Sequence, residues 1–194
     1  MIAIIKYNAG NTESVQNALF RIGVESTVTD DPEQIKHAEK VIFPGVGEAS
    51  SAMKFLRENN LDALISNLKQ PVLGICLGQQ LMCATIEEGQ TFGMNIFDVE
   101  VKKFPEKDLV PHMGWNTLQN LKSPLFEGIS AENDVYFVHS YYCEMSPDAI
   151  ATCDYILPFS AALQKNNFFA TQFHPEKSGG TGAKILENFI RLKI

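Results

Sequence analysis

The chain has 194 residues with a formal net charge of −7, and 45% of its residues are hydrophobic and 20% charged. This length suits one domain with a substantial core, and the composition excludes disordered and fibrous proteins. The acidic charge, without any cluster of Lys and Arg, argues against a nucleic-acid-binding protein. No apolar run reaches membrane-spanning length, and Met1–Ile5 lacks a signal-peptide pattern. We therefore expect a single cytoplasmic domain over residues 1–194.

Strand and helix patterns alternate through the first half of the chain. Strands are predicted at residues 2–7, 24–29, 41–43 and 72–75, and helices at 12–22, 31–38 and 48–68, the last with a break near residues 59–60. We expect Thr12 to cap the first helix and Pro32 to start the second. The alternation predicts βαβ units, and hence a mainly parallel sheet with helices on both faces. Ligands of such sheets bind beyond the carboxyl ends of the strands, so the loops after Tyr7 and Phe43 and the turn at Cys76 should share one edge.

The second half of the chain has a different pattern. Short aromatic and β-branched segments are predicted as strands at residues 98–104, 116–118, 135–138, 150–154, 160–164 and 168–172. The turn at Lys165-Asn166-Asn167 separates the last two. We expect antiparallel strands and hairpins laid onto the parallel sheet, followed by an amphipathic helix at 183–192. The predicted fold class is α/β, with a mainly parallel sheet flanked by helices and added antiparallel strands.

The four cysteines, Cys76, Cys83, Cys143 and Cys153, indicate neither a zinc site nor a disulfide framework. None lies in a C-x-x-C pair, and no histidine has zinc-finger spacing. Without a secretory segment, the thiols are expected to remain reduced. We expect no metal and no organic cofactor.

One cysteine has the context of a nucleophile. The stretch Gly74–Gln80 follows a short apolar strand and runs into a helical pattern, with a glycine on each side of Cys76. This is the pattern of a nucleophile elbow, which places the side chain at a sharp turn between strand and helix. Free N–H groups and the helix dipole favour a thiolate there. The alternative is a buried cysteine at a tight turn, unless a base and an oxyanion hole are found elsewhere.

A candidate oxyanion loop lies at Pro44–Gly47, directly after a predicted strand. Glycines allow unusual backbone angles, so N–H groups here can point at an oxyanion. The alternative is a plain strand-to-helix turn. Ser178–Lys184 matches neither of the glycine-rich phosphate motifs and is interpreted as a helix start.

The candidate base is His174. Glu176 lies two residues further on, so both side chains can face the same way at a strand end. A histidine oriented by a carboxylate is what a cysteine nucleophile requires. A turn with a solvated glutamate is the alternative, and His112 and His139 are competing bases, although neither has a carboxylate at matching spacing.

Several stretches together resemble the class I (triad) glutamine amidotransferases, and most of all the HisH family, the glutaminase subunits of imidazole glycerol phosphate synthase. The similarity covers essentially the whole chain and is carried by Tyr7–Asn11, Pro44–Gly47, Gly74–Gln80, Pro111–Asn116, Tyr136–Tyr141 and His174–Glu176. It implies the flavodoxin-like fold of these enzymes and a single amidotransferase domain. The chain departs from the family pattern at two positions, and both affect only local loop shape. Gln79 stands where the family more often has Met, and Asn95 stands where a second Gly is common in the family.

The resemblance also implies residue roles. Cys76 would be the nucleophile, His174 the base and Glu176 the group that orients it. The Val46 and Leu77 N–H groups would form the oxyanion hole, and Gly45 and Gly47 would permit the loop to rearrange. The bound glutamine would be held by Gln80, Glu88 and the backbone of Ser140 and Tyr141. The face toward the partner would contain Met113, Trp115 and Tyr136.

The implied reaction is hydrolysis of glutamine to glutamate and ammonia. The ammonia would pass to a partner in a heterodimer, the cyclase subunit with a (βα)8 barrel, for histidine biosynthesis. Two alternatives remain open. The chain can be an amidotransferase subunit for a different synthase of the amidino-sugar type, or a non-catalytic scaffold subunit that keeps the fold.

Overall fold

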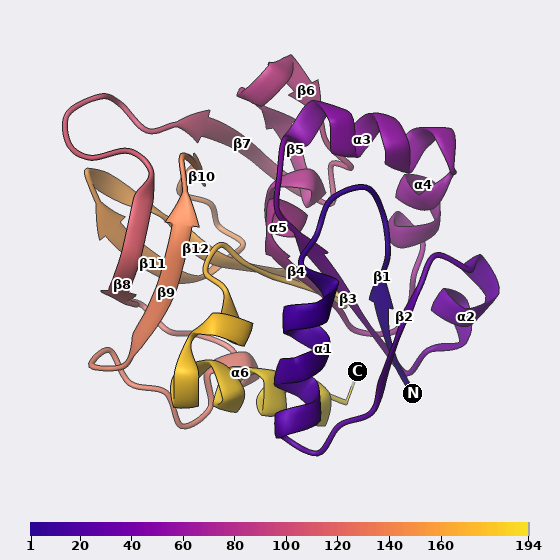
Figure 1. The fold of residues 1–194 in the computed structure, drawn as a ribbon. Helices are drawn as coiled ribbons and strands as arrows, with labels where there is room; N and C mark the ends of the chain where they lie inside the picture. Colours follow the sequence, from indigo (N-terminus) through magenta and orange to yellow (C-terminus); the bar gives the residue numbers. More distant parts are fainter. Residues whose placement is uncertain (194) are drawn as a thin grey trace.

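The computed structural model describes residues 1–193, which fold around a seven-stranded sheet (Figure 1). The strand order is β11-β12-β13-β4-β3-β1-β2. The strands are β1 (Ile2–Ile5), β2 (Ser26–Thr29), β3 (Lys40–Gly45), β4 (Val72–Cys76), β11 (Ala149–Tyr155), β12 (Leu157–Lys165) and β13 (Phe168–Thr171). Pairing is parallel from β2 to β13 and antiparallel from β13 to β11. The predicted α/β class with added antiparallel strands is therefore confirmed.

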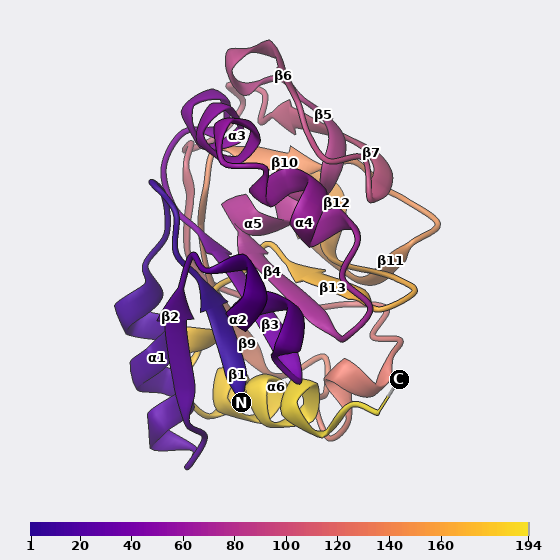
Figure 2. The same ribbon diagram turned by 90° about the vertical axis from the view of Figure 1, so that its right-hand side faces the viewer.

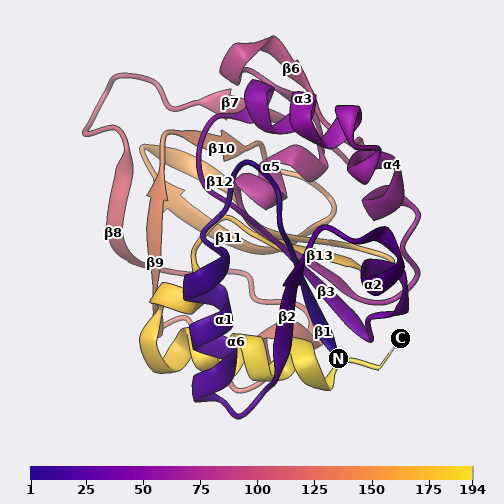
Figure 3. The same ribbon diagram turned by 45° about the vertical axis from the view of Figure 1, so that its right-hand side comes forward.

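Helices cover both faces of this sheet (Figures 2 and 3). They are α1 (Thr12–Arg21), α2 (Pro32–His37), α3 (Ala49–Glu58), α4 (Leu61–Ser66), α5 (Leu77–Met82) and α6 (Gly179–Arg191). Successive residues of β1 point to opposite faces, as strand geometry requires. Ile4 packs into the core under α1 and α6, whereas Ile5 packs into the core under α2 to α5. None of the helices in the described part of the chain is long and apolar enough to cross a bilayer.

Two smaller sheets stand beside the main one. One has the order β10-β7-β5-β6, and the other is the β8–β9 hairpin. Their strands are β5 (Cys83–Ile86), β6 (Thr91–Phe92), β7 (Phe97–Lys103), β8 (His112–Thr117), β9 (Asp134–His139) and β10 (Tyr141–Cys143). The expectation that all the later strands are laid onto the parallel sheet is thus wrong in part: only β11 to β13 join it, and β13 pairs with β4 in parallel.

Several predicted boundaries also differ. Asn11, not Thr12, caps α1, because its side chain accepts a hydrogen bond from the Ser14 N–H. The break at residues 59–60 is confirmed, with Asn60 in the left-handed region at φ 55°. The helix after Cys76 is short, because the N–H groups of Met94 and Ile96 take up carbonyls at its end. Strand β5 then begins at residue 83. Three 3₁₀ turns are also present within residues 1–193: Glu88–Gln90, Pro124–Phe126 and Pro175–Lys177.

Candidate active site

Cys76 occupies a strained turn between β4 and α5. Its backbone angles are φ 54° and ψ −109°, in a region that non-glycine residues rarely adopt. Such strain persists only where the surrounding packing imposes it, and it is common at reactive residues. The start of α5 packs closely against β3, and only glycine fits at residue 78, since a Cβ there would lie 2.0 Å from the Phe43 carbonyl oxygen. The predicted nucleophile elbow is present.

His174 and Glu176 form a buried pair in the turn after β13. His174 Nδ1 lies 2.7 Å from Glu176 Oε1, and their side chains are 1% and 2% exposed. The turn is fixed by backbone contacts, because the His174 N–H donates to the Tyr136 carbonyl and the Ser178 hydroxyl donates to the His174 carbonyl. The alternative of a solvated glutamate is therefore excluded.

The charge on His174 is stabilised by its neighbours. Burial alone would lower its pKa, but the negative charge of the nearby Cys76 sulfur, followed by Glu176, raises the pKa of His174 to about 10. His174 therefore carries a proton at neutral pH when Cys76 is a thiolate.

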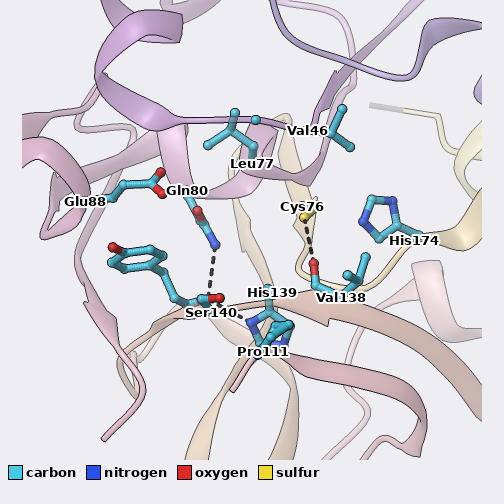
Figure 4. Close-up of a pocket in the computed structure, with 12 residues that line it drawn as sticks. Val46, Cys76, Leu77, Gln80, Glu88, Pro111, Val138, His139, Ser140 and His174 are labelled. Atoms are coloured by element: carbon cyan, nitrogen blue, oxygen red, sulfur yellow. Dashed lines mark hydrogen bonds between the residues drawn. The ribbon is translucent and has the colours of Figure 1, made fainter. Parts of the chain in front are cut away.

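The Cys76 sulfur and the His174 ring face the same space (Figure 4). The sulfur lies 3.9 Å from the Val138 carbonyl oxygen and 3.7 Å from Gln172 Nε2. His174 Nε2 is buried and has no hydrogen-bond partner within residues 1–193. A buried donor without a partner is unfavourable in a resting protein, so this nitrogen is available to a reacting group.

A pocket of about 390 Å³ opens over the sulfur. It is lined by Val46, Gly47, Cys76, Leu77, Gln80, Glu88, Pro111, Val138, His139, Ser140, Tyr141 and His174. Most of the residues expected at the site therefore meet in one cavity. Two expected residues lie behind its wall: Glu176 is behind His174, and Gly45 packs against α5, where a Cβ would be 2.6 Å from the Gly78 nitrogen.

The loop expected to hold the oxyanion lies at the pocket rim. Val46 is 38% exposed, and Gly47 has φ 117°, a conformation that favours glycine. Leu77 lines the same cavity as the first residue of α5, where helix N–H groups lack intrahelical partners. The two peptide units thus flank the nucleophile.

The far end of the pocket carries polar groups (Figure 4). Gln80 Nε2 donates to the Tyr141 carbonyl at 3.1 Å and to Gln172 Oε1 at 3.0 Å. Glu88 accepts from the Ala49 N–H at 2.8 Å. Burial is the main reason that the pKa of Glu88 lies above its usual value. A carboxylate here is suited to bind a ligand ammonium group.

The three residues expected at a partner face lie outside the pocket, on the β8–β9 hairpin. Met113 and Trp115 are 63% and 57% exposed. Trp115 pairs with Tyr136 in the hairpin register, with ring centroids 5.9 Å apart. The Tyr136 carbonyl bonds to the His174 N–H, so this hairpin is linked directly to the candidate base.

Gln172 is a residue that the sequence analysis gave no role. It bridges Gln80 and Cys76, through Oε1 and Nε2 respectively. The signal was available, because Gln172 lies two residues before His174, which lies two before Glu176. Pro111, Val138 and His139 also line the pocket. The sequence analysis expected none of them there: His139 was considered only as a competing base, and Pro111 and Val138 only as parts of stretches that resemble the family.

The two competing histidines are poorly suited to act as bases. His112 Nδ1 lies 3.0 Å from His139 Nε2, and His139 Nδ1 lies 2.7 Å from the Tyr141 carbonyl oxygen. Burial lowers the pKa of His139 to about 3 and that of His112 to about 4. Both rings are neutral and already paired.

The two departures from the family pattern have local explanations. Gln79 points into the interior, where its Nε2 donates to Cys143 Sγ at 3.1 Å and to the Ser160 carbonyl at 3.2 Å. Asn95 adopts φ 53°, a conformation that asparagine tolerates better than most residues. Within residues 1–193, neither side chain is hydrogen-bonded to a triad residue.

Comparisons with known proteins agree with this site. The family model for class-I glutamine amidotransferases matches residues 3–192. The chain is 58% identical to "Imidazole glycerol phosphate synthase subunit HisH" of Bacteroides thetaiotaomicron, covering 98% of this chain and 99% of that one. The HisH subunits of Pasteurella multocida and Methanosarcina acetivorans are 46% and 45% identical, covering 97% and 98% of this chain and 96% and 98% of theirs.

Solved structures show the same fold. A structure of PurLQS from Thermotoga maritima superposes with a TM-score of 0.73 at 15% identity, covering 97% of this chain and 96% of that one. A glutamine amidotransferase from the same organism gives a TM-score of 0.63 at 17% identity, covering 97% and 81%. The full-length relatives and the family match together show that the chain belongs to the class I glutamine amidotransferases, within the HisH family.

Proposed function

We propose that this chain hydrolyses glutamine to glutamate and ammonia through a thioester on Cys76, and supplies the ammonia to a synthase. One observation carries the proposal: a cysteine on a strained elbow and a buried His174–Glu176 pair meet at one end of a single pocket. The other end presents Glu88 and Gln80, which suit the charged end of an amino acid.

The first half-reaction forms the thioester. The Cys76 thiolate attacks the carboxamide carbon, and the carbonyl oxygen becomes an oxyanion that accepts hydrogen bonds from the Val46 and Leu77 N–H groups. The tetrahedral intermediate collapses as the C–N bond breaks. His174 gives its Nε2 proton to the departing nitrogen, which leaves as ammonia, while Glu176 holds the ring through Nδ1.

The second half-reaction removes the acyl group. His174 Nε2, now without a proton, takes one from a water molecule that attacks the thioester carbon. The same oxyanion hole holds the second tetrahedral intermediate, and the C–S bond breaks to release the γ-carboxylic acid, which gives its proton to solvent and leaves as glutamate. The thiolate and the protonated His174 are restored, a state favoured by the raised pKa of His174.

The polar groups at one end of the pocket favour one orientation of the substrate. Glu88 would pair with the α-ammonium group of glutamine, and Gln80 with the backbone of Ser140 and Tyr141 would form the rest of the amino-acid site. The carboxamide then reaches the Cys76 sulfur at the opposite end of the cavity.

The ammonia acceptor would lie on a partner protein. The curated relatives are named as subunits of imidazole glycerol phosphate synthase, which supports the cyclase subunit, a (βα)8 barrel, as the partner in a cytoplasmic heterodimer. The exposed Met113 and Trp115, with Tyr136, would form the docking face on β8–β9. We also propose that residues 1–194 act as one amidotransferase domain.

Co-expression with the cyclase subunit tests this proposal. Cys76→Ala should abolish synthesis from glutamine and leave synthesis from added ammonium intact, because the acceptor chemistry lies in the partner. Cys83→Ala, a buried cysteine outside the pocket, is the matched control and should keep glutamine-dependent activity. Greater damage from Cys83→Ala, or productive assembly only with an amidino-sugar synthase, would contradict the assignment.

A further inference from the structure

Two buried histidines outside the triad face each other beside the pocket. His112 and His139 are register partners on β8 and β9 and are 3% and 6% exposed. Their rings are joined by a 3.0 Å contact between His112 Nδ1 and His139 Nε2. His139 also lines the pocket, yet the proposed chemistry uses neither ring.

The hydrogen positions on both rings follow from their partners. The Tyr141 carbonyl oxygen, 2.7 Å from His139 Nδ1, can only accept, so His139 carries its hydrogen on Nδ1. His139 Nε2 is then an acceptor, and His112 Nδ1 must donate to it. His112 Nε2 is in turn an acceptor, and it faces the Asn116 amide nitrogen at 3.3 Å.

The hydrogen bonds at the Asn116 end of this row agree with these hydrogen positions. Asn116 Oδ1 accepts from the Thr117 N–H at 2.8 Å, which leaves its amide nitrogen as the donor toward His112. The His112 ring is stacked against Tyr155, with centroids 3.9 Å apart, and against Phe137 at 4.6 Å. Stacking holds the plane of the ring, and the partners at its two nitrogens set the hydrogen-bond direction from Asn116 to the Tyr141 carbonyl.

The row of hydrogen bonds ends at the Tyr141 carbonyl, on the backbone segment that forms the pocket wall. The Tyr141 carbonyl accepts from both His139 Nδ1 and Gln80 Nε2, which occupies both of its lone pairs. The preceding carbonyl, of Ser140, accepts from the Phe104 N–H at 3.0 Å. The Ser140–Tyr141 segment is thus held from two sides, and His139 supplies the shortest of the three contacts.

We propose that His139 is a positioning residue for glutamine: its Nδ1–H holds the Tyr141 carbonyl, and His112 selects the tautomer that can do so. The inference rests on the proposed function, in which the backbone of Ser140 and Tyr141 lies along the bound amino acid. Loss of the Nδ1 donor should let this wall relax. Glutamine binding would suffer, whereas the reacting groups around Cys76 would remain in place.

Two substitutions at residue 139 separate the effect of losing the Nδ1–H donor from the effect of losing the imidazole ring. Asparagine places its side-chain amide near the position of Nδ1, so His139→Asn keeps a donor for the Tyr141 carbonyl. Glutamine places its amide near the position of Nε2, so His139→Gln keeps an acceptor for His112 but loses that donor. Both variants remove the imidazole, and they therefore control for a merely structural loss.

The experiment is steady-state glutaminase kinetics of each variant in complex with the cyclase subunit, with ammonium-dependent synthesis as the control for assembly. We expect His139→Gln to raise the glutamine KM about tenfold, the effect of one lost hydrogen bond, with kcat changed less than about threefold. His139→Asn should keep KM within about threefold of wild type. In the wild-type chain, ¹⁵N NMR should show hydrogen on Nδ1 and none on Nε2 of both rings.

Three results would overturn the inference: equal KM values for His139→Gln and the wild type, a KM as high in His139→Asn as in His139→Gln, or hydrogen on His139 Nε2. Failure of the proposed function looks different, because the wild-type complex would then show no glutaminase activity. The NMR result does not depend on activity and remains a test in that case.

Discussion

Glu176→Gln removes one negative charge from behind His174 without changing the size of the side chain. If the new amide turns its oxygen to His174 Nδ1, its NH₂ group occupies the place of Oε2, which is buried and has no partner in the described part of the chain. If it turns the nitrogen instead, His174 must carry its hydrogen on Nε2 alone, and the imidazolium cannot be paired. Each arrangement weakens the protonated state of the ring.

The magnitude follows from the contact that is lost. A hydrogen bond to a charged group contributes about 1.5–3 kcal/mol, against about 0.5–1.5 kcal/mol for a neutral one. A loss of about 1–2 kcal/mol corresponds to roughly a 5- to 30-fold lower kcat/KM. Removing the carboxylate also lowers the pKa of His174 from about 10, so the alkaline limb of the pH–rate profile should move to lower pH.

The assay is glutaminase kcat/KM between pH 6 and pH 10 in the assembled complex. His174→Ala should be the more damaging change, because it removes the group that carries the proton. Glu187→Gln, on the partly exposed side of α6, is the matched control and should leave the profile unchanged. A folded Glu176→Gln protein with wild-type rates and an unmoved alkaline limb would refute this reasoning.

Three further predictions address packing, docking and acid stability. Gly78→Ala places a Cβ 2.0 Å from a backbone oxygen of β3, so the urea midpoint should fall by the equivalent of about 1–3 kcal/mol, whereas Gly180→Ala in open space should not lower it. Tyr136→Ala should reduce the partner's stimulation of glutaminase activity more than it reduces binding in a titration, because it removes the ring packed against Trp115 on the proposed docking face, on the strand whose backbone carbonyl at Tyr136 bonds to the His174 N–H. An isolated wild-type chain as fast as the complex would contradict this. His112 and His139, with pKa values of about 4 and 3, take up protons near pH 6.5 only when unfolded, so each should lower the free energy of unfolding by up to about 1.4 kcal/mol per pH unit below 6.5. Urea titrations at pH 7 and pH 5 should show that the free energy of unfolding falls less with decreasing pH in a variant with Asn at both positions than in the wild type. An equal fall in both proteins would count against burial of neutral rings.

The sequence predicted those features that depend on local pattern. Alternating strand and helix periodicity was sufficient for the parallel part of the sheet, because each βαβ unit is signalled within its own residues. The elbow was predictable for the same reason, since Gly74 and Gly78 flank the cysteine. Spacing also placed His174 and Glu176 together, and the structure joins them at 2.7 Å.

Features that depend on distant contacts could not be predicted this way. The separate sheet of β5, β6, β7 and β10 exists because chain segments from residue 83 to residue 143 meet, and short strands carry little periodicity of their own. The short length of α5 depends on N–H groups from residues 94 and 96. The pairing of His112 with His139 likewise depends on the register of a hairpin whose strands are separated by a long loop.

The proposed mechanism requires a γ-glutamyl thioester on Cys76, and acid quenching followed by peptide mass spectrometry can detect this intermediate. The complex would be mixed with glutamine, quenched within the first turnovers and digested. We expect the added glutamyl mass to appear on the peptide containing Cys76, to accumulate further when deacylation is slowed, and to be absent from the Cys76→Ala protein. Glutaminase turnover with no acyl group on Cys76, or with the added mass on Cys83, would contradict it.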